Sequence, residues 1–233
     1  MGLLVTWNMQ GATGFGGSKW RQDVSRLFLQ QGVDIACLQE CGAPPGSGVP
    51  VNVGQFATVP PYVWAAFTWN LGSTRRPFTV YGLWMRTDPG GNRNNLAIVT
   101  ATAPQSFLWC AGTNYGRPAI GARMAGPNNT SLDFYTLHAC SGNGGGDGRT
   151  LLNNISNGGG TWFAAGDYNK DPNAWANENP APPGVLCAHG DITHPGSGTL
   201  LDYAFASANA RTGTVDGSLI CAECVVCCFG CLR

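Results

Sequence analysis

The apolar residues of this chain fall into short runs, and polar residues mark where many of the runs end. The first run, "LLVTWNMQ" at residues 3–10, places Trp7 and Met9 on one face and Asn8 and Gln10 on the other. A period of two residues is typical of a strand that buries one face. The pattern therefore predicts a first strand that hides Trp7 and Met9 in the core and turns two amides toward a cleft.

A helix and a second strand are predicted next. The stretch "SKWRQDVSRLFLQQG" at residues 18–32 has the apolar spacing of an amphipathic helix, which Ser18 can cap and Gly32 can end. The apolar run "VDIACLQE" at residues 33–40 follows. The chain thus opens as strand, helix and strand, with Glu40 at the exit of the second strand.

The remainder of the chain is rich in predicted strands. Runs of β-branched and aromatic residues, separated by Gly, Pro and Asn, occupy residues 62–71, 78–86, 96–104, 106–110, 131–141, 161–167 and 198–207. A weaker helical pattern begins near Asp147 and includes Leu151, Leu152 and Ile155. Two β-rich halves with few helices predict an α/β (α+β) fold, a β-sandwich flanked by helices. We expect one domain, residues 1–233, with residues 217–233 as a divergent, Cys-rich last strand.

Composition limits the function classes. Charged residues make up 11% of the chain and the formal net charge is zero. This composition argues against a broad electrostatic surface for nucleic acid, but it is compatible with a local basic groove. No apolar run approaches the roughly 18 residues that span a bilayer, and no leader pattern is present. We expect either a cytosolic protein or a secreted one whose leader is absent from this chain.

Ten cysteines divide into two groups. Cys37 and Cys140 lie in apolar strand patterns and are predicted to be core thiols. Five others crowd into the tail "CAECVVCCFGCLR", whose spacing suits Zn²⁺ or an iron cluster. The same segment can also be a strand of small apolar residues with some disulfides.

Several apolar runs share one design, because their last residues are polar. The polar residues concerned are Asn8, Gln10, Glu40, His138, Asp167, Asn169 and Asp202. Strand ends at one rim of a sandwich converge, so we expect these carboxylates, amides and the imidazole to line one cleft. The chain has only 13 acidic residues, so three of them at strand ends are a substantial share.

Such a set suits the attack of water on a phosphodiester. Mg²⁺ prefers carboxylate and amide oxygens together with water, which Glu40 and Asn8 can supply. Asp167 and Asn169 can orient the nucleophile and the phosphate, while His138 moves a proton or donates to the phosphate. In "RPAIGAR", the guanidinium groups of Arg117 and Arg123 can neutralise the developing charge.

Each of these residues also has an ordinary structural explanation. Asn8 and Glu40 can be a loop amide and a solvated acid at a strand end. Asp167 and Asn169 can form an Asx-type turn, and a lone histidine on a strand is usually a hydrogen-bonded core residue. The functional interpretation depends on the joint pattern.

Taken in order, the motifs resemble a known family. They are "TWNMQG", "VDIACLQECGAPP", "GNRNNLAIVT", "RPAIGARM", "FYTLHACSGNGGGD", "WFAAGDYNKDP" and "GTLLDYAFA". Together they look like the catalytic B subunits of cytolethal distending toxins, which belong to the deoxyribonuclease I-like endonuclease/exonuclease/phosphatase superfamily. The resemblance extends over roughly residues 3 to 210. "GNRNNLAIV" and "RPAIGAR" point to the toxin branch in particular.

The resemblance implies a four-layer α/β sandwich and a Mg²⁺-dependent hydrolase that nicks DNA in the nucleus of a target cell. It also implies secretion and companion subunits for delivery. Carried over by residue, it makes Asn8 and Glu40 metal-site groups and Arg117 and Arg123 phosphate contacts, with Gln10 toward the rim. It assigns catalysis to His138, Asp167, Asn169 and Asp202, the last as support for a second histidine.

That second histidine is absent from the expected motif. The family closes with Ser-Asp-His on its last strand, whereas this chain has histidines only at 138, 189 and 194. The best superposition of "LICAECVVCCF" places Ala222, Glu223 and Cys224 there, so Glu223 becomes a candidate metal ligand. Since a proton-transfer group typically contributes 10²–10⁴-fold, we expect impaired activity.

Two other functions fit the same sequence. One is a phosphoinositide phosphatase of the same fold, an activity also ascribed to the family, which needs the same metal cleft and a different basic rim. The other is a non-catalytic, toxin-like binding protein that keeps the sandwich to engage partner subunits or DNA.

Overall fold

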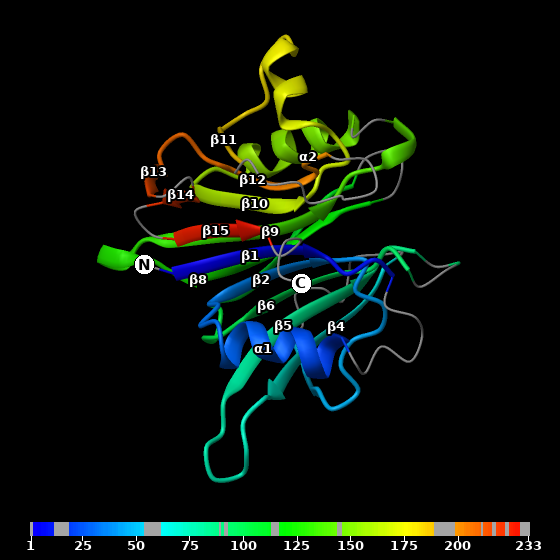
Figure 1. The fold of residues 1–233 in the computed structure, drawn as a ribbon, viewed down its shortest axis with the longest axis vertical. Coiled ribbons are helices and arrows are strands. Elements are labelled where there is room, and N and C mark those ends of the chain that lie inside the picture. The colour runs from blue at the N-terminus through cyan, green and yellow to red at the C-terminus, as the bar shows by residue number, and fades with distance from the viewer. Residues whose placement is uncertain are drawn as a thin grey trace.

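Two β-sheets packed face to face form the centre of the molecule, and helices cover their outer sides (Figure 1). The computed structural model describes residues 2–11, 19–53, 62–88, 90, 93–112, 117–143, 146–188, 199–210, 212–215, 218–221 and 224–228. Within these residues the predicted β-sandwich flanked by helices is confirmed.

The first sheet contains the opening strand of the chain and most of the N-terminal half. Its strands are β1 (Gly2–Asn8), β2 (Ile35–Gln39), β3 (Val49–Val51), β4 (Val63–Asn70), β5 (Thr79–Arg86), β6 (Leu96–Thr100), β13 (Thr212–Val215), β14 (Ser218–Cys221) and β15 (Cys224–Cys228). Their order among the described residues is β13-β14-β15-β1-β2-β6-β5-β4-β3. β1 runs parallel to both of its neighbours, β2 and β15.

The second sheet comes from the middle and the C-terminal half of the chain. Its strands are β7 (Ser106–Cys110), β8 (Ala119–Ala125), β9 (Ser131–His138), β10 (Thr161–Asp167), β11 (Val185–Cys187) and β12 (Asp202–Ala206), in the order β11-β12-β10-β9-β8-β7. β9 and β10 are parallel to each other. Each sheet therefore has a central pair of parallel strands whose carboxyl ends meet at one edge.

The helices are short. They are η1 (Lys19–Val24), α1 (Ser25–Leu29), η3 (Pro127–Asn129), η4 (Ser141–Asn143), α2 (Gly146–Asn157) and η5 (Pro172–Asn177). The predicted helix near the N-terminus is confirmed over residues 19–29, while its proposed cap Ser18 lies outside the described residues. Among the helices described here, none combines the length and the apolar character needed to cross a membrane.

Three clusters of buried side chains divide the molecule into layers. The central cluster lies between the sheets and includes Cys37, Ile98 and Phe163. A second cluster packs η1 and α1 against the first sheet, and a third packs α2 and η5 against the second sheet. The result is a four-layer arrangement of helices, sheet, sheet and helices, as the family resemblance implies.

Some elements differ from the sequence-based expectation. The strands β3 and β11 are only three residues long, too short to show a clear period. The β8 segment was singled out for its arginines and was not predicted to be a strand. Cys37 is fully buried in β2, as predicted. The same prediction is wrong for Cys140, which follows β9 in the turn to η4 and is only partly buried. In the tail, residues 218–221 and 224–228 form the strands β14 and β15.

Candidate functional site

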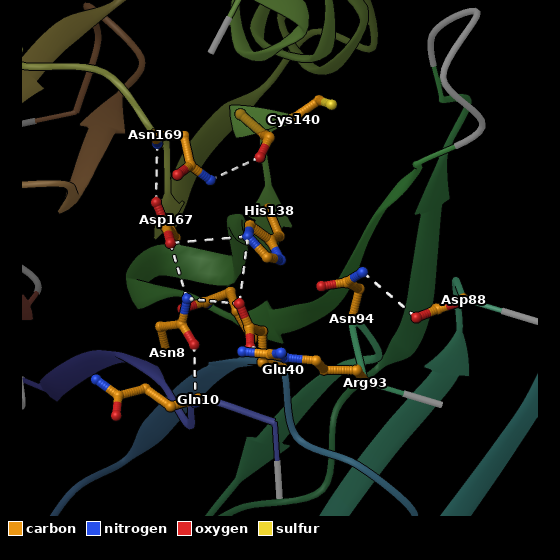
Figure 2. Close-up of polar contacts among 12 residues, drawn as sticks. Asn8, Gln10, Glu40, Asp88, Arg93, Asn94, His138, Cys140, Asp167 and Asn169 are labelled. Carbon is orange, nitrogen blue, oxygen red and sulfur yellow. Dashed lines mark hydrogen bonds and ion pairs between the residues drawn. The ribbon is translucent and has the colours of Figure 1, made fainter. Parts of the chain in front are cut away.

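Four strand ends bring the candidate residues together where the two sheets meet (Figure 2). In the first sheet, Asn8 at the end of β1 pairs in register with Gln39, so Glu40 follows at the same edge. In the second sheet, His138 at the end of β9 pairs with Asp167 at the end of β10. Parallel neighbours carry their last residues to the same edge, which explains why residues 159 positions apart come into contact.

The amide of Asn8 joins the two sheets. Its Nδ2 donates to Asp167 Oδ2 at 2.8 Å and lies 3.4 Å from Glu40 Oε1. A primary amide has two N–H donors, so one nitrogen can serve two carboxylates. Asn8 thereby holds Glu40 and Asp167 close together while partly offsetting the repulsion between their charges.

His138 faces the same carboxylates. Its Nε2 lies 3.7 Å from Asp167 Oδ2 and 4.0 Å from Glu40 Oε1. Burial, and to a lesser degree the charge of Arg117, lowers the pKa of His138 to about 3, an effect that nearby carboxylates oppose. Its Nδ1 is buried without a hydrogen-bond partner among the described residues. His138 is thus a buried ring with Nε2 facing the two acids and Nδ1 without a hydrogen-bond partner among the described residues.

The chain turns sharply just after three of these strands. Gln10, Glu40 and Asn169 have φ values of 53°, 48° and 48°, in the left-handed region that side chains other than glycine adopt at a cost of about 1–2 kcal/mol. For Gln10 this turn ends the strand alternation. Met9 is fully buried as predicted, but the Gln10 side chain is exposed and its backbone N–H donates to Asn8 Oδ1 at 2.9 Å. The expectation that strand geometry turns both amides into the cleft is therefore wrong for Gln10.

The Asp167 and Asn169 pair forms the Asx-type turn that is one of the ordinary interpretations of the sequence. The Asn169 backbone N–H donates to Asp167 Oδ1 at 2.8 Å. The turn also directs Asn169 Nδ2 to the carbonyl of Ala139, at 2.8 Å, and Arg117 Nη1 donates to the same carbonyl at 3.1 Å. The turn therefore places Asn169 and Arg117 around one shared acceptor beside His138.

The comparisons with known proteins agree with this arrangement. A model described as the Endonuclease/Exonuclease/phosphatase family matches residues 5–222. The chain belongs to this family.

Individual relatives point to the toxin branch. The chain is 34% identical to a homologue of the cytolethal distending toxin B subunit from Salmonella typhi over 75% of its length, and 31% identical to the cytolethal distending toxin B subunit of Escherichia coli over 72%. These matches span 66% and 64% of the relatives' own lengths, just under two thirds. The solved cytolethal distending toxin from Haemophilus ducreyi matches with a TM-score of 0.75 at 32% identity, covering 90% of this chain and 88% of that one. The predicted resemblance to these subunits, and their deoxyribonuclease I-like fold, are confirmed.

Asp202 lies beside the site. It starts β12 and pairs in antiparallel register with Asp167, and it is buried. Residues directly opposite on neighbouring strands project from the same face. The structure therefore brings Asp202 to the group that contains Asp167 and His138.

Arg123 is not brought to the site. Its guanidinium forms a double hydrogen bond with Asp133, at 2.7 Å to each carboxylate oxygen. Asp133 precedes His138 by five residues on β9, which corresponds to roughly 17 Å along the strand and to the opposite face of the sheet. The expectation that Arg123 joins Arg117 at the phosphate is not supported, because the strand separates them.

Glu223 lies outside the described residues. Its described neighbour Cys224 pairs with Gly2, at the start of β1, whereas Cys228 pairs with Thr6. Gly2 is six residues from Asn8, or about 20 Å of extended strand. This register contradicts the superposition that puts Cys224 where the family has its histidine.

Two residues near the site were missed from the sequence. Arg93 Nε lies 3.3 Å from Glu40 Oε2, although "GNRNNLAIV" served only as a family marker. Asn95, in the same motif, is fully buried and donates from Nδ2 to the Gly42 carbonyl at 2.8 Å. Cys41 donates its backbone N–H to the Asn95 carbonyl at 3.1 Å. These contacts hold the chain just after Glu40. The spacing of residues in the motif did not indicate this role.

The donor set suits a hard divalent cation. No group of three or more His, Cys, Asp and Glu side chains with the geometry of a metal site occurs in the described part of the chain. Mg²⁺ needs fewer, because it usually takes one or two carboxylates and keeps several waters. Glu40 has a side chain that is 14% exposed, so water can reach its oxygens, and the Asn8 Oδ1 adds an amide oxygen. The residues therefore fit a hard divalent cation.

Proposed function

We propose that the protein is a Mg²⁺-dependent phosphodiester hydrolase that cuts the DNA backbone, as the resemblance to toxin B subunits implies. One observation carries the proposal. Glu40 and Asp167, from different sheets, are joined by Asn8, and His138 Nε2 lies within 4.0 Å of both. Two acids, an amide and an imidazole where the two sheets meet can together support the metal-assisted hydrolysis of a phosphodiester.

Glu40 and Asn8 would hold the metal ion. A bound Mg²⁺ supplies Lewis-acid stabilisation of the charge that develops on the phosphate. Asp167 and Asn169 orient the attacking water and a phosphoryl oxygen, since the Asn169 backbone N–H holds the Asp167 carboxylate and the Ala139 carbonyl holds the Asn169 amide. Asp202 supports this pair from the neighbouring strand.

His138 moves the proton. Because burial lowers its pKa, the ring is neutral near pH 7, and the form that accepts a proton is populated. Nε2 faces Asp167 and Glu40, where the nucleophile would lie, so it is the nitrogen that would take up the proton, while Nδ1 is buried away from water. A cutting rate below that of the toxin subunits is part of the proposal, since His138 is the only histidine in the described part of the chain.

Cations and a rim amide bind the substrate. Arg117 uses one nitrogen on the Ala139 carbonyl and keeps the remaining guanidinium N–H groups for a phosphate. Arg93 is largely exposed, with 68% of its side-chain surface accessible, and can meet the DNA backbone at the rim. Gln10 is also exposed and would do the same from the rim, outside the cleft.

The biological setting is proposed by similarity. The curated relatives are toxin subunits, so we propose that the protein is secreted, is delivered by companion chains and acts in the nucleus of a target cell. Because the matched region spans just under two thirds of those relatives, these points stand as proposals separate from the chemistry of the cleft.

Nicking of supercoiled plasmid DNA tests the proposed reaction. We expect open-circular product with Mg²⁺ and none with EDTA, and a loss of about 100-fold or more in His138→Ala and Glu40→Gln. Asp34→Asn is the control, since Asp34 is exposed and contacts the start of β1. Cutting that survives EDTA or the His138→Ala change would refute the assignment. Phosphate release from a soluble inositol phosphate, with no plasmid nicking, would favour the phosphatase alternative.

A further inference from the structure

The peptide unit between Ala139 and Cys140 connects the site to helix α2. Its carbonyl, from Ala139, accepts hydrogen bonds from Asn169 Nδ2 at 2.8 Å and Arg117 Nη1 at 3.1 Å. Its N–H, from Cys140, donates to Asp147 Oδ1 at 2.8 Å. Figure 2 shows Asn169 and Cys140 above His138, with Asp167 beside the ring. One rigid peptide plane therefore has two site residues on one side and a carboxylate on the other.

Asp147 has an unusually buried carboxylate. It lies in the first turn of α2 and is only 3% exposed. Its second oxygen, Oδ2, is buried without a hydrogen-bond partner among the described residues. An unpaired buried polar atom costs free energy. The helix N-terminus, whose partial charge is positive, and the charge-assisted bond to Cys140 offset part of that cost.

Packing prevents Asp147 from moving independently of the strand ends. A Cβ at the next residue, Gly148, would lie 3.3 Å from Tyr168 Cδ1 and 3.5 Å from Ala139 Cβ. The start of α2 is thus in close contact with the residues that follow His138 and Asp167. Because this contact leaves little room, Asp147 is held in one position beside the Ala139–Cys140 peptide.

We propose that Asp147 is a positioning residue for the reaction. It fixes the plane of the Ala139–Cys140 peptide and thereby aligns Asn169 and Arg117, which share the Ala139 carbonyl. Its charge also polarises the peptide, which strengthens the carbonyl as an acceptor. The inference rests on the proposed function, since Asn169 and Arg117 are assigned to the phosphate there.

Steady-state cleavage of a short DNA duplex with Mg²⁺ tests the proposal. In Asp147→Ala the Cys140 N–H loses its acceptor, so the peptide plane is held only through the Ala139 carbonyl and can tilt. Misplacement of groups by about 1 Å typically costs 100-fold, so kcat should fall by about 10- to 100-fold. Asp147→Asn keeps an acceptor oxygen and should retain activity within about tenfold of the unchanged protein. Asp34→Ala removes a matched bond, from the Leu3 N–H at 2.8 Å, and should leave kcat unchanged.

A double-mutant cycle separates positioning from general stabilisation. If Asp147 acts through Asn169, adding Asp147→Ala to Asn169→Ala should lower kcat by less than about threefold more. If the two losses multiply, the proposal is overturned. A kcat that is unchanged once the rate is divided by the folded fraction would also overturn it, because that is the behaviour of a purely structural residue.

Amide hydrogen exchange gives a measurement that does not depend on activity. The Cys140 amide should exchange faster in Asp147→Ala than in the unchanged protein, and at an unchanged rate in Asp34→Ala. If the unchanged protein cuts no DNA, the proposed function fails. The exchange measurement still tests whether Asp147 holds the Ala139–Cys140 peptide in place. Unaltered protection of Cys140 in Asp147→Ala would refute the role of Asp147.

Discussion

A single amide nitrogen sets the geometry of the site at the residue scale. Asn8 Nδ2 lies 2.8 Å from Asp167 Oδ2 and 3.4 Å from Glu40 Oε1, so it separates two like charges and links two sheets. A carboxylate at this position would have the same shape and the opposite effect, because it cannot donate when ionised.

Asn8→Asp should therefore destabilise the protein more than Asn8→Ala does. The carboxylate that Asn8→Asp introduces would lie beside Glu40 and Asp167, whose charges raise its pKa. The unfolding free energy should therefore fall as pH rises from about 4 to 7, by on the order of 1–3 kcal/mol. Chemical denaturation at several pH values in EDTA measures this. Equal stabilities of the two variants at pH 7 would contradict the bridging role of Asn8.

Strand register explains, at the element scale, which residues reach the site. The pairing of β9 with β10 brings His138 level with Asp167, and the pairing of β8 with β9 brings Arg123 level with Asp133. An odd separation along β9 then places Asp133 and His138 on opposite faces. Arg117 and Arg123 are six residues apart in sequence, yet only Arg117 contacts the chain next to His138.

Arg123 should accordingly contribute to stability and not to the reaction. Asp133 is 5% exposed, so Arg123→Ala leaves a buried carboxylate without its cation. Since 43% of the Arg123 side chain is exposed, we expect a moderate loss of about 1–2 kcal/mol. Thermal unfolding measures this loss.

The paired variant Arg117→Ala is the control for this prediction. It should slow DNA cutting at saturating Mg²⁺ with a smaller effect on unfolding, because Arg117 Nη1 bonds to a backbone carbonyl and not to a buried acid. If Arg123→Ala slows cutting by as much as Arg117→Ala does, the assignment of Arg123 to a structural role is wrong.

The whole molecule assembles the site only when its two sheets are docked. Glu40 and Asn8 belong to the first sheet, whereas His138 and Asp167 belong to the second. The central cluster that holds the sheets together includes Phe163, which stacks on Phe134 with ring centroids 5.1 Å apart. Stability of the sandwich and integrity of the site should therefore be lost together.

Phe163→Ala tests this coupling. Removing a buried aromatic side chain typically costs about 3–5 kcal/mol, so the midpoint of thermal unfolding should fall by several degrees. The temperature at which DNA cutting is lost should fall by the same amount, while kcat well below that temperature stays within a few-fold. Loss of cutting far below the unfolding midpoint would show that the site opens independently of the sheets.

The sequence alone was informative about local structure and about the kinds of residues at strand ends. The apolar periods predicted a helix within residues 18–32, of which 19–29 are helical, and most of the longer strands, because side-chain periodicity is a local property. The positions of Glu40, His138 and Asp167 at strand ends followed from the same runs. The motifs were sufficient to recognise the family.

Only the tertiary structure decided which of those residues meet and how they are oriented. The left-handed turn that exposes Gln10 and the ion pair that holds Arg123 are local, yet the apolar pattern does not specify them. The contact of Asn8 with Asp167 and the register of Cys224 with Gly2 join chain segments distant in sequence. The role proposed for Asp147 has the same origin, since its bond to Cys140 forms only when α2 packs on the second sheet. Period and spacing describe one strand at a time, whereas a site at a sheet junction depends on how several strands pair.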